Sequence, residues 1–287
     1  MSLPAFKSPV ESGRDARALL LERLSSGTFE LPIMPAMAAE VLAACRDERA
    51  GVERIVRLVS HDPALTAHVL RAANSAAFAA SAPVTAPHQA ISRVGLTTVT
   101  QIALAACVRG KVFQADRYKH LLDPVWPRSV MAAGWARQIA LLKGRDADDA
   151  FLAGLLHDVG RPVIIQALVR IERETKHTFG DDQAAEAMDY LHPRVGGELA
   201  RRWNMPESIA SAIAWHHDPH EAVEHRADVF ANSFAVSLAE WSLEGDAGDV
   251  AAACHRAFLD ALEIGPDEVD RLLAQRESVV ALAEGLI

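Results

Sequence analysis

The chain has 287 residues, half of them hydrophobic and 6% aromatic, with 29 Lys and Arg against 38 Asp and Glu. This length allows one large domain or two modest ones with a core that needs no disulfide or metal, and an apolar content rich in Ala, Leu and Val is typical of packed helices. We therefore expect an all-α protein. The net charge of −9 gives no overall attraction to nucleic acid or anionic membranes, so we expect the chain to bind neither.

The cysteines and the first residues indicate where the chain resides. Cys45, Cys107 and Cys254 are isolated, which fits a reducing compartment and excludes a zinc site built from Cys-x-x-Cys pairs. Residues 1–13 lack the basic and apolar regions of a signal peptide, and no run approaches the roughly 18 apolar residues of a spanning helix. We therefore expect a cytoplasmic, unprocessed protein.

Apolar spacing predicts a series of helices in the N-terminal third, over 15–24, from Pro35 to about residue 46, and around residues 55–59. Asp62 followed by Pro63 predicts an N-cap and a first helical residue, so the His61-Asp62 doublet is interpreted as structural. Two short helices around Gly95 have the outline of a helix-turn-helix, but the acidic balance and the few basic residues nearby argue against DNA binding.

The central motif is the His157-Asp158 doublet. A helix is expected to open at Trp126-Pro127-Arg128-Ser129. Asp148 and Asp149 are expected to cap the next helix, which Gly160 and Pro162 would end. Adjacent helical residues point about 100° apart, so both members of the doublet can reach one ion only from a concave wall made by neighbouring helices.

Later histidines strengthen this signal. His192-Pro193 predicts the start of a helix, and another helix leads to His216 and His217. Imidazoles and a carboxylate from separate helices are ligands of zinc, iron and manganese. Each residue also has a structural explanation, since His192 could cap its helix, His216 could interact with a helix dipole, and Asp158 could hold a cation or backbone amides.

Ordered motifs along the chain resemble the HD-related output domain, or HDOD, family of bacterial signalling proteins. The resemblance covers about residues 24–241 and implies an N-terminal helical part (24–115) and an HD-like part (116–241), with 1–23 as an extension and 242–287 as C-terminal helices. The motifs that carry it are Leu31-Pro32-Ile33-Met34-Pro35, Asp62-Pro63-Ala64-Leu65-Thr66, Ala73-Asn74-Ser75-Ala76, Ala90-Ile91, Val94-Gly95, Leu155-Leu156-His157-Asp158-Val159-Gly160, His192 with Gly196, Trp203-Asn204-Met205-Pro206 and His216-His217-Asp218-Pro219.

The resemblance also implies a site. Related HD phosphohydrolases hold metal with an early His, the His-Asp doublet and a late Asp, and HD-GYP phosphodiesterases add further histidines. The matching positions are Arg128 for the early His, His157 and Asp158 for the doublet, His192 and His216 or His217 for the added histidines, and Asn232 for the late Asp.

Two of these positions depart from the metal-binding pattern. Asn232 removes a negative charge, and Arg128 is a permanent cation whose repulsion of a divalent ion about 4 Å away is roughly 8 kcal/mol at an effective dielectric near 20. We therefore expect weak or no metal binding. Arg128 should instead pair with Asp158 through a fork of two hydrogen bonds, the alternative being an Arg128 that extends to solvent. Asn232 could satisfy His157 or a buried water.

Two functions follow. The favoured one is a non-catalytic bacterial signal-transduction module without a cofactor, which binds a signalling protein or a small effector through a degenerate HD pocket. The alternative is a phosphohydrolase that acts on a nucleotide or cyclic dinucleotide and uses Fe, Mn or Zn held by His157, Asp158, His192 and His216. After a break at 264–267, one amphipathic helix reaching Val279 is expected to pack back on the core.

Overall fold

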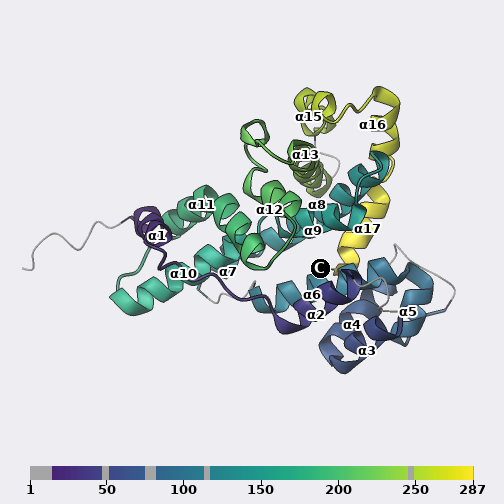
Figure 1. Ribbon diagram of the computed structural model, residues 1–287, viewed down its shortest axis with the longest axis horizontal. Coiled ribbons are helices and arrows are strands. Elements are labelled where there is room, and N and C mark those ends of the chain that lie inside the picture. Colours follow the sequence, from purple (N-terminus) through teal and green to yellow (C-terminus); the bar gives the residue numbers. More distant parts are fainter. Residues whose placement is uncertain (1–14, 47–51, 75–81, 113–116, 245–248, 287) are drawn as a thin grey trace, which may run out of the picture.

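The computed structural model describes residues 15–46, 52–74, 82–112, 117–244 and 249–286, and every regular element in these ranges is a helix (Figure 1). The all-α prediction is confirmed. The expectations for residues 1–13 and the predicted boundary between residues 115 and 116 lie outside the described residues. The N-terminal helices are α1 (Ala16–Ser25), α2 (Ala36–Arg46), α3 (Val52–His61), α4 (Pro63–Ala73), α5 (Pro87–Val94) and α6 (Leu96–Val112).

The remaining helices form the second part of the molecule. Figure 1 shows α2 to α6 gathered at the lower right of the view. Among the helices that follow, α9 contacts α6, and α17 contacts α4, α6 and α8. The helices of this second part are α7 (Lys119–Leu122), α8 (Val125–Leu142), α9 (Ala147–Leu156), α10 (Gly160–Thr175), α11 (Asp181–Arg202), α12 (Glu207–Ala214), the 3-10 turn η2 (Pro219–Glu221), α13 (Arg226–Leu243), α14 (Val250–Ala253), α15 (Arg256–Ala261), α16 (Pro266–Leu273) and α17 (Arg276–Leu286).

The start of α4 is capped as predicted. The Asp62 side chain accepts hydrogen bonds from the backbone N–H groups of Ala64 and Leu65, at 2.8 and 3.0 Å, and Pro63 is the first helical residue. These bonds satisfy two donors that a helix leaves unpaired at its start. The structural interpretation of the His61-Asp62 doublet is therefore confirmed.

The close approach of α8 and α9 positions the second doublet. A Cβ atom added to Gly154 would lie 2.7 Å from the carbonyl oxygen of Ala132 and from the Cα of Ala133, so only glycine lets the two backbones meet here. Trp135 of α8 is fully buried and donates its indole N–H to Ser242 Oγ of α13 at 2.9 Å. Together these contacts fix α8 between α9 and α13 and bring the end of α9 near the start of α8.

Four expected helix boundaries are wrong. Asp146, not Asp148 or Asp149, caps α9, because its side chain accepts from the backbone N–H groups of both residues. Gly160 and Pro162 begin α10, where the missing N–H of proline costs no hydrogen bond. His192 and Pro193 lie inside α11 instead of starting a helix. The single C-terminal helix expected to reach Val279 is divided into α16 and α17.

One expectation about membrane spans also needs correction. Residues 147–175, which comprise α9, the following turn and α10, are long and apolar enough to qualify as one candidate spanning segment among the described residues. However, 83% of its most apolar window is buried inside the fold. Its composition is therefore that of a core helix pair, which contacts α8, α11 and α12.

Candidate functional site

Histidine and aspartate side chains from three segments between residues 157 and 217 converge at one place. His157 and Asp158 occupy the turn between α9 and α10 and are each 1% exposed, while His192 of α11 is completely buried. His216, which follows α12, is 4% exposed, and the adjacent His217 is exposed. We call these residues the histidine cluster. The four buried residues of the cluster are therefore not polar residues of a solvent-exposed helix face.

Backbone carbonyls fix the tautomers of the buried imidazoles. The Nδ1 atom of His157 lies 2.7 Å from the Gly154 carbonyl oxygen, and that of His216 lies 2.7 Å from the Ile213 carbonyl oxygen. A carbonyl oxygen only accepts hydrogen bonds, so each Nδ1 carries the proton and donates it. In the neutral form of each ring, Nε2 then carries a lone pair that faces the interior of the cluster.

The proline inside α11 orients His192 in the same way. Pro193 has no N–H, so the carbonyl of Asp189, four residues earlier, lacks its helical donor. His192 Nδ1 lies 2.9 Å from that carbonyl oxygen and 3.0 Å from the carbonyl oxygen of Met188. Pro193 thus leaves the Asp189 carbonyl oxygen free to accept the hydrogen bond that orients the His192 imidazole.

The imidazole nitrogens lie at the spacing of metal ligands. His192 Nε2 is 3.3 Å from His216 Nε2, 3.1 Å from His217 Nε2 and 3.2 Å from Asp158 Oδ1. Four ligands about 2.0–2.1 Å from a tetrahedral zinc ion would be separated by about 3.3 Å. Burial lowers the pKa of His192 to about 3 and that of His216 well below its usual value, so both are neutral at pH 7. Two facing lone pairs at such distances repel unless a cation or a proton lies between them.

Asp158 is an ionised carboxylate held by an arginine that the sequence analysis did not single out. Arg161 Nε donates to Asp158 Oδ1 at 2.7 Å, and its Nη1 donates to Asp189 Oδ1. Burial alone would raise the pKa of Asp158, but its contacts with His157, Arg161 and His192 hold that pKa well below the usual value. One spacing could have signalled the contact with Asp158, since Arg161 follows it by three residues.

Arg128 makes a weaker contact than expected. Its Nη1 lies 3.8 Å from Asp158 Oδ2, at the outer limit of an ion pair, and its side chain is 31% exposed. The expected fork of two hydrogen bonds is absent, because Arg161 already occupies the other carboxylate oxygen at short range. Arg128 therefore adds a second positive charge beside Asp158 without being its main partner.

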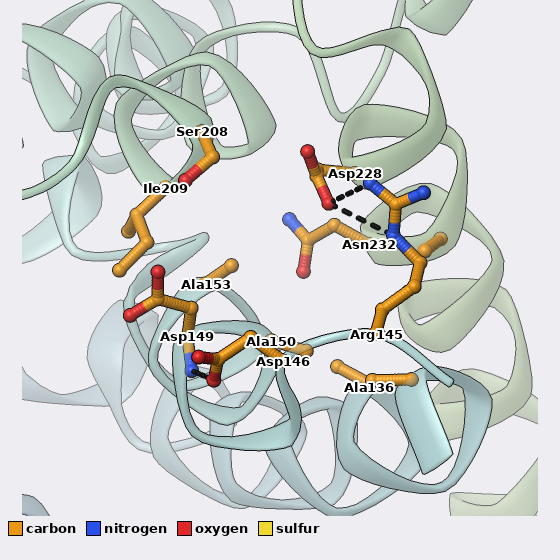
Figure 2. Close-up of a pocket in the computed structure, with 12 residues that line it drawn as sticks. Ala136, Arg145, Asp146, Asp149, Ala150, Ala153, Ser208, Ile209, Asp228 and Asn232 are labelled. Atoms are coloured by element: carbon orange, nitrogen blue, oxygen red, sulfur yellow. Dashed lines mark hydrogen bonds and ion pairs between the residues drawn. The ribbon is translucent and has the colours of Figure 1, made fainter. Parts of the chain in front are cut away.

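Asn232 makes no hydrogen bond to the histidine cluster. Its Nδ2 donates to the carbonyl oxygen of Ala212 at 2.9 Å, and its Oδ1 has no partner among the described residues. The last carbonyls of a helix lack helical donors, and Ala212 lies in the last turn of α12. The expectation that Asn232 satisfies His157 is wrong: Asn232 lines a separate cavity (Figure 2).

The cluster fits a divalent ion by donor type, but its charge does not favour one. Buried His157 Nε2 and Asp158 Oδ2 lack hydrogen-bond partners among the described residues and face each other at 3.4 Å. Two groups have ligand atoms close enough for an ion, namely His192, His216 and His217, and His157, Asp158 and His216. These are donors for zinc, iron or manganese. Two guanidinium groups beside Asp158 oppose the charge of such an ion.

Comparisons with known proteins agree with this architecture. The sequence model of the HDOD domain matches residues 31–219. An uncharacterized protein of Treponema pallidum (strain Nichols) is 29% identical over 218 residues, which cover 72% of this chain and 41% of that protein. A ribonuclease Y of Thermus thermophilus is 34% identical over 115 residues, which cover 40% of this chain and 16% of the ribonuclease. The chain therefore spans less than half the length of these relatives.

The fold is also found in solved structures. The crystal structure of an HDOD domain protein with unknown function from Geobacter sulfurreducens superposes with a TM-score of 0.68 at 24% identity, covering 94% of this chain and 98% of that one. At this level of identity the likeness shows a shared fold.

Proposed function

Because this chain belongs to the HDOD family, we propose that it is a non-catalytic regulatory module that acts by binding another protein or a small effector. The observation that carries the proposal is the state of Asp158. Its carboxylate accepts a 2.7 Å hydrogen bond from Arg161 and has Arg128 3.8 Å away. Neither arginine can be deprotonated in a protein. The negative charge that a hydrolytic metal ion would need is therefore already balanced.

Arg128 adds a second argument. By the family resemblance it stands at the position of the early histidine, so a ligand is replaced by a cation. Asn232 adds a third, because its amide donates to Ala212 and could not do so as a carboxylate. Both departures remove features that metal-dependent hydrolysis requires.

A metal-dependent phosphohydrolase acting on a nucleotide is the second candidate. His157, Asp158, His192 and His216 would hold one ion, and the ion would supply an activated water. The fixed Nε2 lone pairs favour this candidate, and one relative is named a ribonuclease.

Metal content and hydrolysis decide between the two. We would purify the chain without chelator, measure Zn, Fe and Mn per chain, and assay bis(p-nitrophenyl) phosphate, cyclic di-GMP and a short RNA with each metal added. The proposal expects no hydrolysis above that of His157→Ala, with His88→Ala as a control at an exposed histidine outside the cluster. Stoichiometric metal together with hydrolysis that His157→Ala abolishes and His88→Ala preserves would establish the phosphohydrolase instead.

A further inference from the structure

A cavity of about 260 Å³ lies between α8, the first part of α9 and the starts of α12 and α13 (Figure 2). We call it the α9 cavity. Its apolar surface comes from alanines of α8, α9 and α13 and from Ile209. A surface of this kind packs well against the hydrocarbon of a ligand and poorly against a strongly hydrated ion.

The charged residues of the lining already have partners within the protein. Arg145 donates from Nε, at 3.1 Å, and from Nη2, at 2.5 Å, to one oxygen of Asp228 (Figure 2). The Asp146 side chain caps α9 by accepting from the backbone N–H groups of Asp148 and Asp149. Asp149 has a further interaction within the fold. The charges of the lining are thus used inside the protein, and a neutral ligand suits the cavity better than an ion.

The amide of Asn232 supplies a buried hydrogen-bond acceptor to this cavity. Asn232 is 2% exposed, and its Oδ1 has no hydrogen-bond partner among the described residues. Its orientation is fixed, because the Ala212 carbonyl accepts from Nδ2 and could not accept from Oδ1. Figure 2 shows the amide projecting between the surrounding helices. An unpaired buried acceptor costs free energy, which a ligand with an N–H donor would recover.

Ser208 supplies a second neutral polar group. It lies near the start of α12 in the lining of the cavity and is half-buried, and its hydroxyl can donate to a carbonyl oxygen. A cyclic amide carries an N–H donor and a carbonyl acceptor on a hydrocarbon ring and has no charge. The size of the cavity suits such a molecule, because it is smaller than a typical drug site.

We propose that the α9 cavity binds a small neutral cyclic amide, with Asn232 Oδ1 accepting its N–H and the alanine surface packing against its ring. This proposal rests on the proposed function, since it names the chemical class of an effector for the regulatory module. The α9 helix leads from the cavity to the His157-Asp158 doublet. A ligand here would therefore contact an element that positions the histidine cluster.

The test compares the lactam carbostyril with the lactone coumarin, which has the same two fused rings but a ring oxygen in place of the amide N–H. Isothermal titration calorimetry of the whole chain should show saturable binding of one carbostyril per chain. Coumarin should bind at least about tenfold more weakly, because Asn232 Oδ1 would stay without a donor. Both titrations contain chelator, so the result is independent of the metal content and hydrolysis that test the proposed function.

Two variants locate the binding site. Asn232→Leu removes the acceptor at nearly the same side-chain size and should erase the preference for carbostyril over coumarin. Ala150→Leu should abolish binding of both compounds by filling the cavity. Its matched control is Ala147→Leu, since Ala147 lies on the same helix and does not line the cavity. Thermal unfolding shows which variants fold, and Ala150→Leu locates the site by itself if Asn232→Leu does not.

Four outcomes would overturn the proposal. The first is no saturation of the wild type up to about 2 mM carbostyril, which would leave water as the partner of Asn232 Oδ1. The others are equal binding of coumarin by the wild type, a preference for carbostyril that persists in Asn232→Leu, and unaltered binding by a folded Ala150→Leu.

Discussion

Gly160 lies directly against the backbone of His192, so a Cβ atom added to Gly160 would sit 2.8 Å from the Cα of His192. This contact joins the start of α10, which follows the His157-Asp158 doublet, to the middle of α11. The helices that carry Asp158 and His192 can approach closely only because residue 160 has no side chain. The 3.2 Å separation of Asp158 Oδ1 and His192 Nε2 depends on this approach.

Gly160→Ala should therefore destabilise the fold. The new methyl group would meet backbone atoms, which cannot rotate away, and we expect the free energy of unfolding in urea to fall by about 1–3 kcal/mol. Gly110→Ala on α6 is the control, since no described atom outside the backbone of its own helix lies within 4 Å of the added Cβ, and it should gain about 0.5–1 kcal/mol. Equal effects of the two substitutions would show that the close approach is not required.

Arg161 and Arg128 should differ sharply in their effect on stability. Arg161→Gln removes the short partner of a buried carboxylate, and we expect a loss of about 3–5 kcal/mol. Arg128→Gln should cost under about 1 kcal/mol, because Arg128 is partly exposed and lies 3.8 Å from Asp158. Urea unfolding of both variants at one pH measures the difference. A larger loss for Arg128→Gln would restore Arg128 as the main partner of Asp158.

Local patterns in the sequence predict the all-α fold and the Asp62 cap, because the spacing of apolar residues and the Asp-Pro pair act within a few residues. The boundary at His192-Pro193 could not be predicted in the same way. Proline usually starts or ends a helix, and its tolerance inside α11 depends on His192 binding the freed Asp189 carbonyl. That bond is visible only in three dimensions.

The candidate site, like the fold, could be predicted from the sequence only in part. The histidines were recognised by residue type, and the structure brings His192, His216 and His217 together. The role of Arg161 was missed because an arginine near a doublet is ordinarily solvated, and its partner Asp189 comes from another helix. The orientation of the Asn232 amide could not be predicted from the sequence either. It depends on the end of α12, which leaves the Ala212 carbonyl oxygen free to accept from Asn232 Nδ2.

Asn232→Asp should destabilise the chain although it adds the acidic residue that the family resemblance expects at this position. The carboxylate could not donate to the Ala212 carbonyl and would be buried, and we expect a loss of about 1–3 kcal/mol at pH 7. A protonated carboxyl can donate, so the loss relative to wild type should shrink as pH falls. Urea unfolding at pH 7 and pH 4 tests this. A loss that stays constant with pH would point to packing instead of the missing donor.

Acid should weaken the fold through the histidine cluster when no metal is present. The folded chain holds the pKa of His192 at about 3, whereas an unfolded histidine titrates near 6.5, so the unfolded state binds more protons between these values. Stability is then complete above pH 6.5 and falls with decreasing pH, by up to about 1.4 kcal/mol per pH unit for each such group. Unfolding in urea with chelator, at intervals from pH 7 to pH 4, should show this slope. His192→Gln should remove the contribution of about one bound proton from the slope, which is up to about 1.4 kcal/mol per pH unit. His88→Gln, at an exposed histidine, should leave the slope unchanged. The same slope in His192→Gln and wild type would show that His192 is not buried in its neutral form.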